Sequence, residues 1–201
     1  MADELNLIGQ KQRASRADAV KNRKVLLDTA RHLFITIGVE TVTMTQIAQE
    51  AGVGKGTLYR HFNNKNEICE ALLDQEMREL QSGTLAKSRA GGDPYENLRW
   101  FLSATITFVY DNSDMLFAGL ETYALGFLES PAHLWWRPTI RGFLQQMKDT
   151  MGCSLPDDLD FLTDALYVML GVGAIRFQQN RGYTLDNIIN GLHATLERLI
   201  D

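Results

Sequence analysis

The chain has 201 residues, 45% of them hydrophobic and 22% charged, with a net charge of −5. These values are ordinary for a folded globular protein, so they exclude a chain that is disordered throughout. No apolar run approaches the roughly 20 residues that span a bilayer, and residues 1–10 lack the long apolar stretch of a signal peptide. We therefore expect a cytoplasmic protein without a membrane partner.

The charges are unevenly distributed along the chain. Residues 1–65 contain 10 Lys and Arg against 6 Asp and Glu, whereas residues 66–201 contain 10 against 19. A basic front and an acidic remainder suit a protein that binds an anion at one end. Chance gives the same imbalance in some chains, so charge alone does not define a function.

The first expected element is a flexible basic arm over residues 1–17. A helix over 18–37 follows, because Leu26, Ala30, Leu33 and Ile37 form one apolar stripe. Gly38 is expected to end this helix as a left-handed cap, a conformation that glycine adopts without steric cost.

Two short helices are expected next. Thr43 and Gln46 have the spacing of a capping box, which predicts a helix that begins after Thr43. The sequence Gly-Val-Gly at 52–54 predicts a tight turn, and a third helix is expected over 55–62. Residues 18–65 are therefore predicted to form a three-helix head that contains a helix-turn-helix.

The remainder, residues 66–201, is expected to be a helical body. Asn64 caps a long connecting helix with Glu67 at its third position. The last two helices are expected at about 157–180 and 185–200, and no segment has the alternating pattern of a strand. The predicted fold class is all-α, with the long helix joining head and body.

The third helix has two different faces. The apolar residues of the two short helices can meet in one small core, and they are Ile47, Ala48, Ala51, Val53, Leu58 and Phe62. This arrangement leaves a surface rich in hydrogen-bond donors on a helix thin enough for a DNA major groove, formed by Lys55, Thr57, Tyr59, Arg60 and His61.

This segment closely resembles the tetracycline-repressor (TetR) family of transcriptional regulators. The resemblance rests on Thr43, Ile-Ala-x-x-Ala-Gly-Val at 47–53, Gly-Thr-Leu-Tyr-x-His-Phe at 56–62, and Lys65. It implies a dimeric repressor, bound to a palindromic operator in double-stranded DNA and released by a small-molecule effector. The body matches the family only in length and helical character, so no particular ligand is implied.

The resemblance places a set of residues at the DNA. Lys55 is the candidate for a guanine contact, worth roughly 1–3 kcal/mol of discrimination. Tyr59 and His61 are expected to position phosphates, Lys65 to clamp one, and Arg60 to influence sequence preference. The predicted DNA-binding residues are Thr43, Thr45, Gly54, Lys55, Gly56, Thr57, Tyr59, Arg60, His61 and Lys65.

The last two helices are the expected dimer frame, because each has a long apolar stripe and the family implies a four-helix bundle there. The predicted interface residues are Leu162, Leu166, Met169, Gly173, Phe177, Ile189, Leu192 and Leu196. Packing of the same stripes within one chain is the alternative.

An effector pocket is expected in the body, which is rich in aromatic residues. The predicted lining residues are Trp100, Ala104, Phe108, Phe117, Glu121, Tyr123, Trp136, Phe143 and Met147. Glu121 and Arg137 are the candidate polar anchors. An inward Glu121 would favour a cationic ligand, and an inward Arg137 an anionic one. The effector is otherwise expected to be small and hydrophobic or aromatic.

Two other classes of function compete with an effector-controlled repressor. A DNA-bound dimeric adaptor would dock a protein partner on its body and have no small-molecule effector. An enzyme is not expected, because the sequence has no catalytic triad, no paired catalytic carboxylates and no phosphate-binding loop. The histidines and cysteines lack metal-ligand spacing, so no metal and no cofactor are expected.

Overall fold

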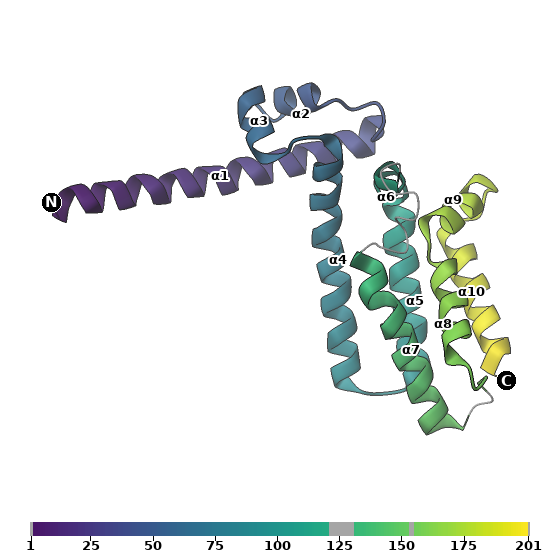
Figure 1. The fold of residues 1–201 in the computed structure, drawn as a ribbon. Coiled ribbons are helices and arrows are strands. Elements are labelled where there is room, and N and C mark those ends of the chain that lie inside the picture. The colour runs from purple at the N-terminus through teal and green to yellow at the C-terminus, as the bar shows by residue number, and fades with distance from the viewer. Residues whose placement is uncertain (1, 121–130, 153–154, 201) are drawn as a thin grey trace. The chain divides into compact units, whose positions relative to one another are not determined.

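The computed structural model describes the backbone of residues 2–120, 131–152 and 155–200, and their side chains outside 2–16, 118–120, 131–134 and 200. Within these ranges every regular element is an α-helix, as Figure 1 shows, which confirms the predicted all-α class. The helices are α1 (Ala2–Ile37), α2 (Met44–Glu50), α3 (Lys55–His61), α4 (Lys65–Ala90), α5 (Pro94–Asp111), α6 (Ser113–Leu120), α7 (Pro131–Met151), α8 (Leu159–Met169), α9 (Val172–Asn180) and α10 (Leu185–Ile200).

The chain divides into two compact units, residues 1–72 and residues 73–201. The first unit contains α1, α2, α3 and the beginning of α4. It therefore extends beyond residue 65, where the sequence analysis placed the end of the head.

A small apolar core holds the first unit together. Leu26 and Ala30 of α1, Ile47 of α2, Leu58 of α3 and Ile68 of α4 are all fully buried. Full burial of a large aliphatic side chain contributes about 1.5–3 kcal/mol. Because Leu58 belongs to this core, the core fixes which face of α3 points outward.

Helix α1 begins at Ala2, where the sequence analysis expected a flexible arm over 1–17. Residues 10–24 contain neither Gly nor Pro and are rich in Ala, Lys, Arg and Gln, which favour helix even without tertiary contacts. The helix consequently begins well before Leu26, the first buried residue among those whose side chains the structure describes. At its other end Gly38 has φ +92°, which confirms the predicted left-handed cap.

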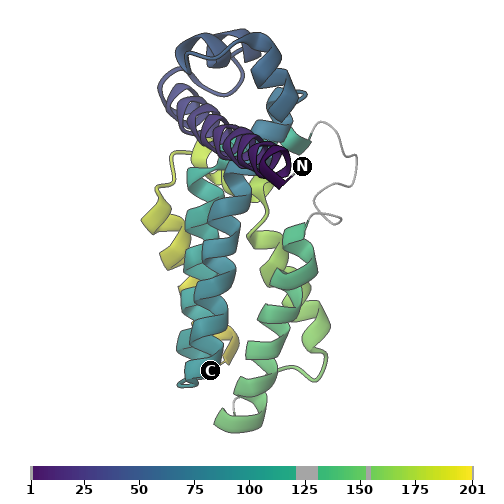
Figure 2. The same ribbon diagram turned by 90° about the vertical axis from the view of Figure 1, so that its left-hand side faces the viewer.

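Helix α5 is the centre of the second unit, since it packs against α6, α7, α9 and α10. Helices α7 and α8 also pack on each other and run side by side in Figure 2. The largest fully buried side chains of this unit are Leu98, Phe101, Leu102, Ile106, Ile140, Leu144, Met147 and Leu166.

The predicted helix over 157–180 is interrupted. Helix α8 ends at Met169, and Gly171 is the N-cap of α9 with φ −66° and ψ 141°, which is extended rather than helical backbone. Glycine loses more conformational freedom in a helix than any other residue, so the break falls where helix propensity is lowest.

Among the helices of the described ranges, none is long and apolar enough to cross a membrane. In those same ranges no group of three or more His, Cys, Asp or Glu side chains is arranged to hold a metal ion.

Candidate nucleic-acid interface

Helix α2 begins with the predicted capping box. The backbone N–H of Gln46 donates to Thr43 Oγ1 at 3.3 Å, and Gln46 Oε1 accepts from the backbone N–H of Thr43 at 2.8 Å. The Thr43 hydroxyl also donates to Gln46 Oε1 at 2.9 Å. These bonds satisfy donors that a helix start otherwise leaves unpaired.

We expect Thr43→Ala to lower the free energy of unfolding by about 1 kcal/mol, because the substitution removes the capping oxygen. Chemical denaturation followed by circular dichroism measures this change. Thr43→Ser is the matched control, since it keeps the hydroxyl. A serine variant as unstable as the alanine variant would show that the hydroxyl does not act as the cap.

The turn between α2 and α3 depends on glycine. Gly52 has φ +67°, a left-handed conformation that costs other residues energy, and the N–H of Val53 returns to the Ala48 carbonyl at 3.0 Å. Gly54 is the N-cap of α3, and its carbonyl accepts from the N–H groups of Thr57 and Leu58 at 2.9 and 3.1 Å. The turn therefore sets α3 directly after α2.

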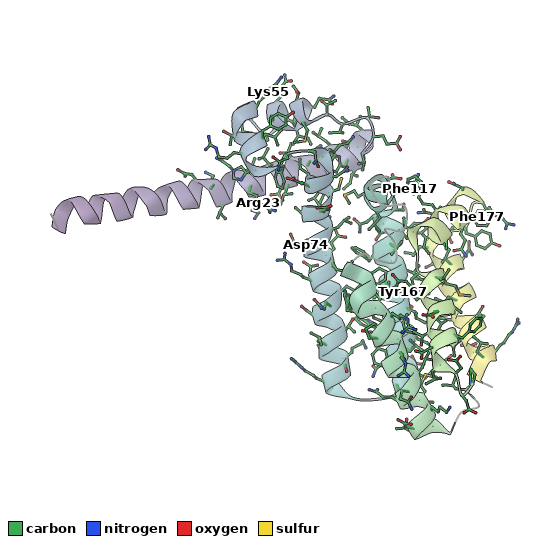
Figure 3. The ribbon with its side chains drawn as sticks, viewed as in Figure 1. Arg23, Lys55, Asp74, Phe117, Tyr167 and Phe177 are labelled. Atoms are coloured by element: carbon green, nitrogen blue, oxygen red, sulfur yellow. The ribbon has the colours of Figure 1, made fainter. Side chains whose placement is uncertain are left out.

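Helix α3 has one buried face and one exposed face. Leu58 is fully buried and Phe62, directly after the helix, is 2% exposed. Lys55, Tyr59 and Arg60 are exposed. Figure 3 shows Lys55 pointing away from the unit. The sequence analysis expected this separation of faces.

The other predicted contact residues lie around this face. Thr43, Thr45, Gly54 and Gly56 are exposed, whereas Thr57 and His61 are half-buried. A Cβ atom added at Gly54 or Gly56 would meet no atom within 4 Å, so open space surrounds both glycines. The backbone at the start of α3 is consequently accessible to a large partner.

Lys65 has a different geometry from the predicted phosphate clamp. Its Nζ donates to the carbonyls of Val39, Glu40 and Val42, at 2.6, 3.1 and 3.1 Å. An ammonium has three N–H donors, so these carbonyls occupy all of them. The geometry thus gives Lys65 a structural role, joining the start of α4 to the segment between α1 and α2.

The start of α4 has further polar contacts. The predicted cap is confirmed, since Asn64 Oδ1 accepts from the backbone N–H of Glu67 at 2.9 Å. The Glu67 carboxylate accepts from the side chain and the backbone N–H of Asn63, both at 2.8 Å. These hydrogen bonds to the charged form, the side-chain one first, lower the pKa of Glu67.

The predicted dimer residues divide into two groups. Leu162, Leu166, Leu192 and Leu196 are buried in the core of their own chain, and Ile189 is half-buried against that core. Met169, Gly173 and Phe177 are exposed, and Figure 3 shows Phe177 pointing away from α9. The alternative of packing within one chain therefore holds for the four leucines.

A second apolar stripe on α8 was not among the sequence predictions. Phe161 and Val168 are 77% and 55% exposed, and Ala165 lies between them at helical spacing. The signal was present in the sequence, because α8 is apolar on nearly every side and a helix of that kind must bury more than one face.

The predicted pocket residues also divide. Phe108, Trp136, Phe143 and Met147 are buried, Trp100 and Ala104 are partly buried against the same core, and Phe117 is 41% exposed. Glu121 and Tyr123 lie outside the described residues.

Arg137 does not have the geometry of an inward anchor for an anion. Its Nε lies 2.6 Å from Asp164 Oδ1, and its Nη2 lies 3.4 Å from Asp160 Oδ1. The hydrogen bond to Asp164 is the main cause that raises the pKa of Arg137. With two carboxylates beside it, this guanidinium does not favour an anionic ligand.

An exposed α3 set on a tight glycine turn defines a helix-turn-helix protein. Residues 26–72 match the family model of bacterial regulatory proteins, tetR family. An HTH-type transcriptional regulator from Staphylococcus aureus (strain bovine RF122 / ET3-1) is 33% identical over 101 residues, which are 50% of this chain and 55% of that protein. The chain thus spans about half the length of this relative.

Solved structures have the same fold. A TetR-family regulator from Pectobacterium atrosepticum aligns with a TM-score of 0.67 at 22% identity, covering 92% of this chain and 95% of the other. Thermus thermophilus FadR, a TetR-family repressor in complex with lauroyl-CoA, aligns with a TM-score of 0.62 at 19% identity, covering 87% and 92%. Residues 26–72 of this chain are thus similar to the tetR family of bacterial regulatory proteins, and the chain shares the fold of these solved structures.

Proposed function

We propose that this protein is a dimeric transcriptional repressor that binds a palindromic operator through α3 and leaves it when a small-molecule effector binds the second unit. The observation that carries the proposal is the division of α3 into two faces. Leu58 is fully buried, whereas Lys55, Tyr59 and Arg60 are exposed on the opposite side.

The exposed face of α3 has the chemistry that DNA requires. The major groove is about 12 Å wide, which admits one α-helix with its side chains. Lys55 stands in the first turn, where a helix-turn-helix makes most of its base contacts. Gly54 and Gly56 present bare backbone beside it, so a phosphate or base edge can approach closely.

An aromatic cluster in the second unit supports effector binding. The rings of Phe101 and Trp135 are 5.7 Å apart between centroids, and those of Phe108 and Trp136 are 6.2 Å apart. Thr105 lies between Phe101 and Phe108 along α5. Rings of this kind line many small-molecule sites, together with a few polar groups.

The polar groups in this cluster are uncharged. Within the described part of the chain, Thr105 Oγ1 and Trp136 Nε1 are buried and have no hydrogen-bond partner. An unpaired buried donor costs about 1–3 kcal/mol. A ligand that offers a neutral acceptor oxygen would relieve this cost, so we propose a largely apolar effector with such an oxygen. The lauroyl-CoA bound by FadR is an example of an acyl ligand in a protein of this fold.

Release requires two states of the protein. An effector shifts the equilibrium only by the difference between its affinities for the DNA-binding state and the released state. Tryptophan fluorescence, to which Trp100, Trp135 and Trp136 contribute, reports ligand binding to the second unit. The operator affinity, measured with and without the same ligand, then reports the coupling between the two sites.

Selection of bound duplexes from a random DNA pool tests the DNA-binding part of the proposal. We expect an enriched palindrome whose half-sites lie about one helical turn apart, or a multiple of that distance. A pool that shows no enrichment, with no binding to any duplex at low salt, would contradict the proposal. Operator affinity unaffected by any bound ligand would instead favour the adaptor.

Lys55→Ala is expected to relax the sequence preference at one position of each half-site, at a cost of roughly 1–3 kcal/mol per guanine contact. Repeating the selection with this variant and comparing the two base-frequency profiles measures the effect. Leu85→Ala, which removes an exposed residue of the second unit, is the control. An unchanged profile for Lys55→Ala would exclude Lys55 from base readout.

A further inference from the structure

The face of α1 that packs in the core of the first unit changes from apolar to basic toward the N-terminus. Phe34, Ala30 and Leu27 follow one another at helical spacing, and Phe34 and Ala30 are buried. The same stripe continues backward through Arg23 and Lys24, then Val20, and reaches positions 16 and 13, which are both arginine. One face of one helix is therefore apolar at one end and cationic at the other.

The side chains of α1 from 17 to 24 are exposed, apart from the half-buried Asn22. Val20, Lys21, Arg23 and Lys24 are exposed, and Val20 is 71% exposed even though it is apolar. Figure 1 shows α1 extending beyond α3 toward its N-terminus. A helix rises about 1.5 Å per residue, so residues 11–24 span roughly 20 Å.

The charge of this segment is strongly positive. Residues 11–24 contain six Lys and Arg and one acidic residue, Asp18. Duplex DNA advances about 3.4 Å per base pair. The segment therefore matches the length of roughly six base pairs of phosphate backbone.

One contact joins the basic segment, residues 11–24, to the end of α3. The guanidinium carbon of Arg23 lies 5.0 Å from the centre of the Phe62 ring. Phe62 is the C-cap of α3 and is 2% exposed. The C-terminal end of the basic segment therefore lies beside the C-terminal end of the helix that we place in the major groove.

We propose that the basic segment of α1, in which Lys21, Arg23 and Lys24 are exposed, is a second DNA-binding surface that contacts the phosphates flanking each half-site. The proposal rests on the DNA-binding function proposed above and extends it. Contacts to phosphates carry no base information, so the surface adds affinity and fixes position without changing the preferred sequence. The bound DNA is therefore longer than the palindrome that α3 reads.

The test compares two duplexes that contain the selected palindrome, one ending at the palindrome and one with about ten further base pairs, one helical turn, on each side. Fluorescence anisotropy gives the affinity of the full-length protein for each duplex over a range of salt concentrations. The variant Lys21→Gln/Lys24→Gln removes two exposed charges of the basic segment. Arg78→Gln/Arg89→Gln is the charge-matched control, because it removes two exposed charges from α4 in the second unit.

We expect the unaltered protein and the control to bind the longer duplex on the order of tenfold more tightly, and the lysine variant to lose most of this gain. The salt slope on the longer duplex should fall by about one unit for each phosphate that the variant no longer neutralises. If the unaltered protein binds both duplexes equally, this inference is wrong while the proposed function stands. If it binds neither duplex, the proposed function itself fails. If Arg78→Gln/Arg89→Gln weakens binding to the longer duplex as much as the lysine variant does, the effect comes from net charge alone. That result would also overturn the inference.

Discussion

Replacing Phe161 and Val168 by glutamate is expected to convert the proposed dimer into a monomer. Both side chains are more than half exposed and lie on one stripe of α8, which we propose as the dimerisation surface. A symmetric interface contains each residue twice, so the double variant alters four apolar side chains. At about 1.5–3 kcal/mol for each buried apolar side chain, the dimer should weaken by at least ~1000-fold.

Analytical ultracentrifugation measures the monomer–dimer equilibrium directly. Operator affinity should fall with dimerisation, because a monomer engages one half-site rather than two. Leu85→Glu is the matched control, since Leu85 is a 49% exposed leucine on α4. If the double variant remains a dimer with unchanged operator affinity, α8 is not the dimerisation surface.

The second large effect is expected for Lys65→Met. This substitution keeps most of the aliphatic side chain but removes the ammonium, so the carbonyls of Val39, Glu40 and Val42 lose their shared donor. Hydrogen bonds to charged groups contribute about 1.5–3 kcal/mol, and we expect stability to fall by an amount of this order. Operator affinity should fall for every sequence, because α2 and α3 are positioned less firmly.

The salt dependence separates this structural role from a phosphate contact. Removing a phosphate contact lowers the salt slope by about one unit per site, whereas destabilising the head leaves the slope unchanged. Lys55→Met is the comparison variant, since Lys55 is exposed and should alter DNA binding without altering stability. Unchanged stability with a reduced slope for Lys65→Met would restore the phosphate clamp expected from the sequence.

Features that depend on neighbours in the chain could be predicted from the sequence. The capping boxes and caps at Thr43, Asn64 and Gly38 involve residues within a few positions of one another, and the structure has them where expected. The two faces of α3 follow from the same local reasoning, because Leu58 alone continues the apolar pattern of the head. Such signals are reliable because they do not require knowledge of distant packing.

Features that depend on distant contacts could not be predicted in this way. The Lys65 ammonium binds carbonyls 23 to 26 positions earlier in the chain, a pairing that no local pattern encodes. The largest apolar stripes of α8 and α10 face the core of their own chain. A helix packs its largest apolar stripe into that core in preference to a smaller stripe. The exposed stripe at Phe161 is recognisable only after that interior is known.

The extent of α1 differs from the sequence prediction for a related reason. The sequence of residues 10–16 contains no large apolar residue, which favours a flexible arm. Helix propensity favours instead the extension of α1 through these residues, since no glycine or proline interrupts residues 10–24. The difference matters for function, because a helix holds its charges along one line and a flexible arm does not.

The outer face of α3 is expected to lie against duplex DNA. Site-specific photo-crosslinking tests it most directly, with a photoreactive amino acid placed at Arg60, on the exposed face of α3, or at Leu85, on α4 in the second unit. On the selected operator we predict a strong crosslink from position 60 and none from position 85. Operator that is crosslinked equally from both positions, or only from position 85, would contradict the account.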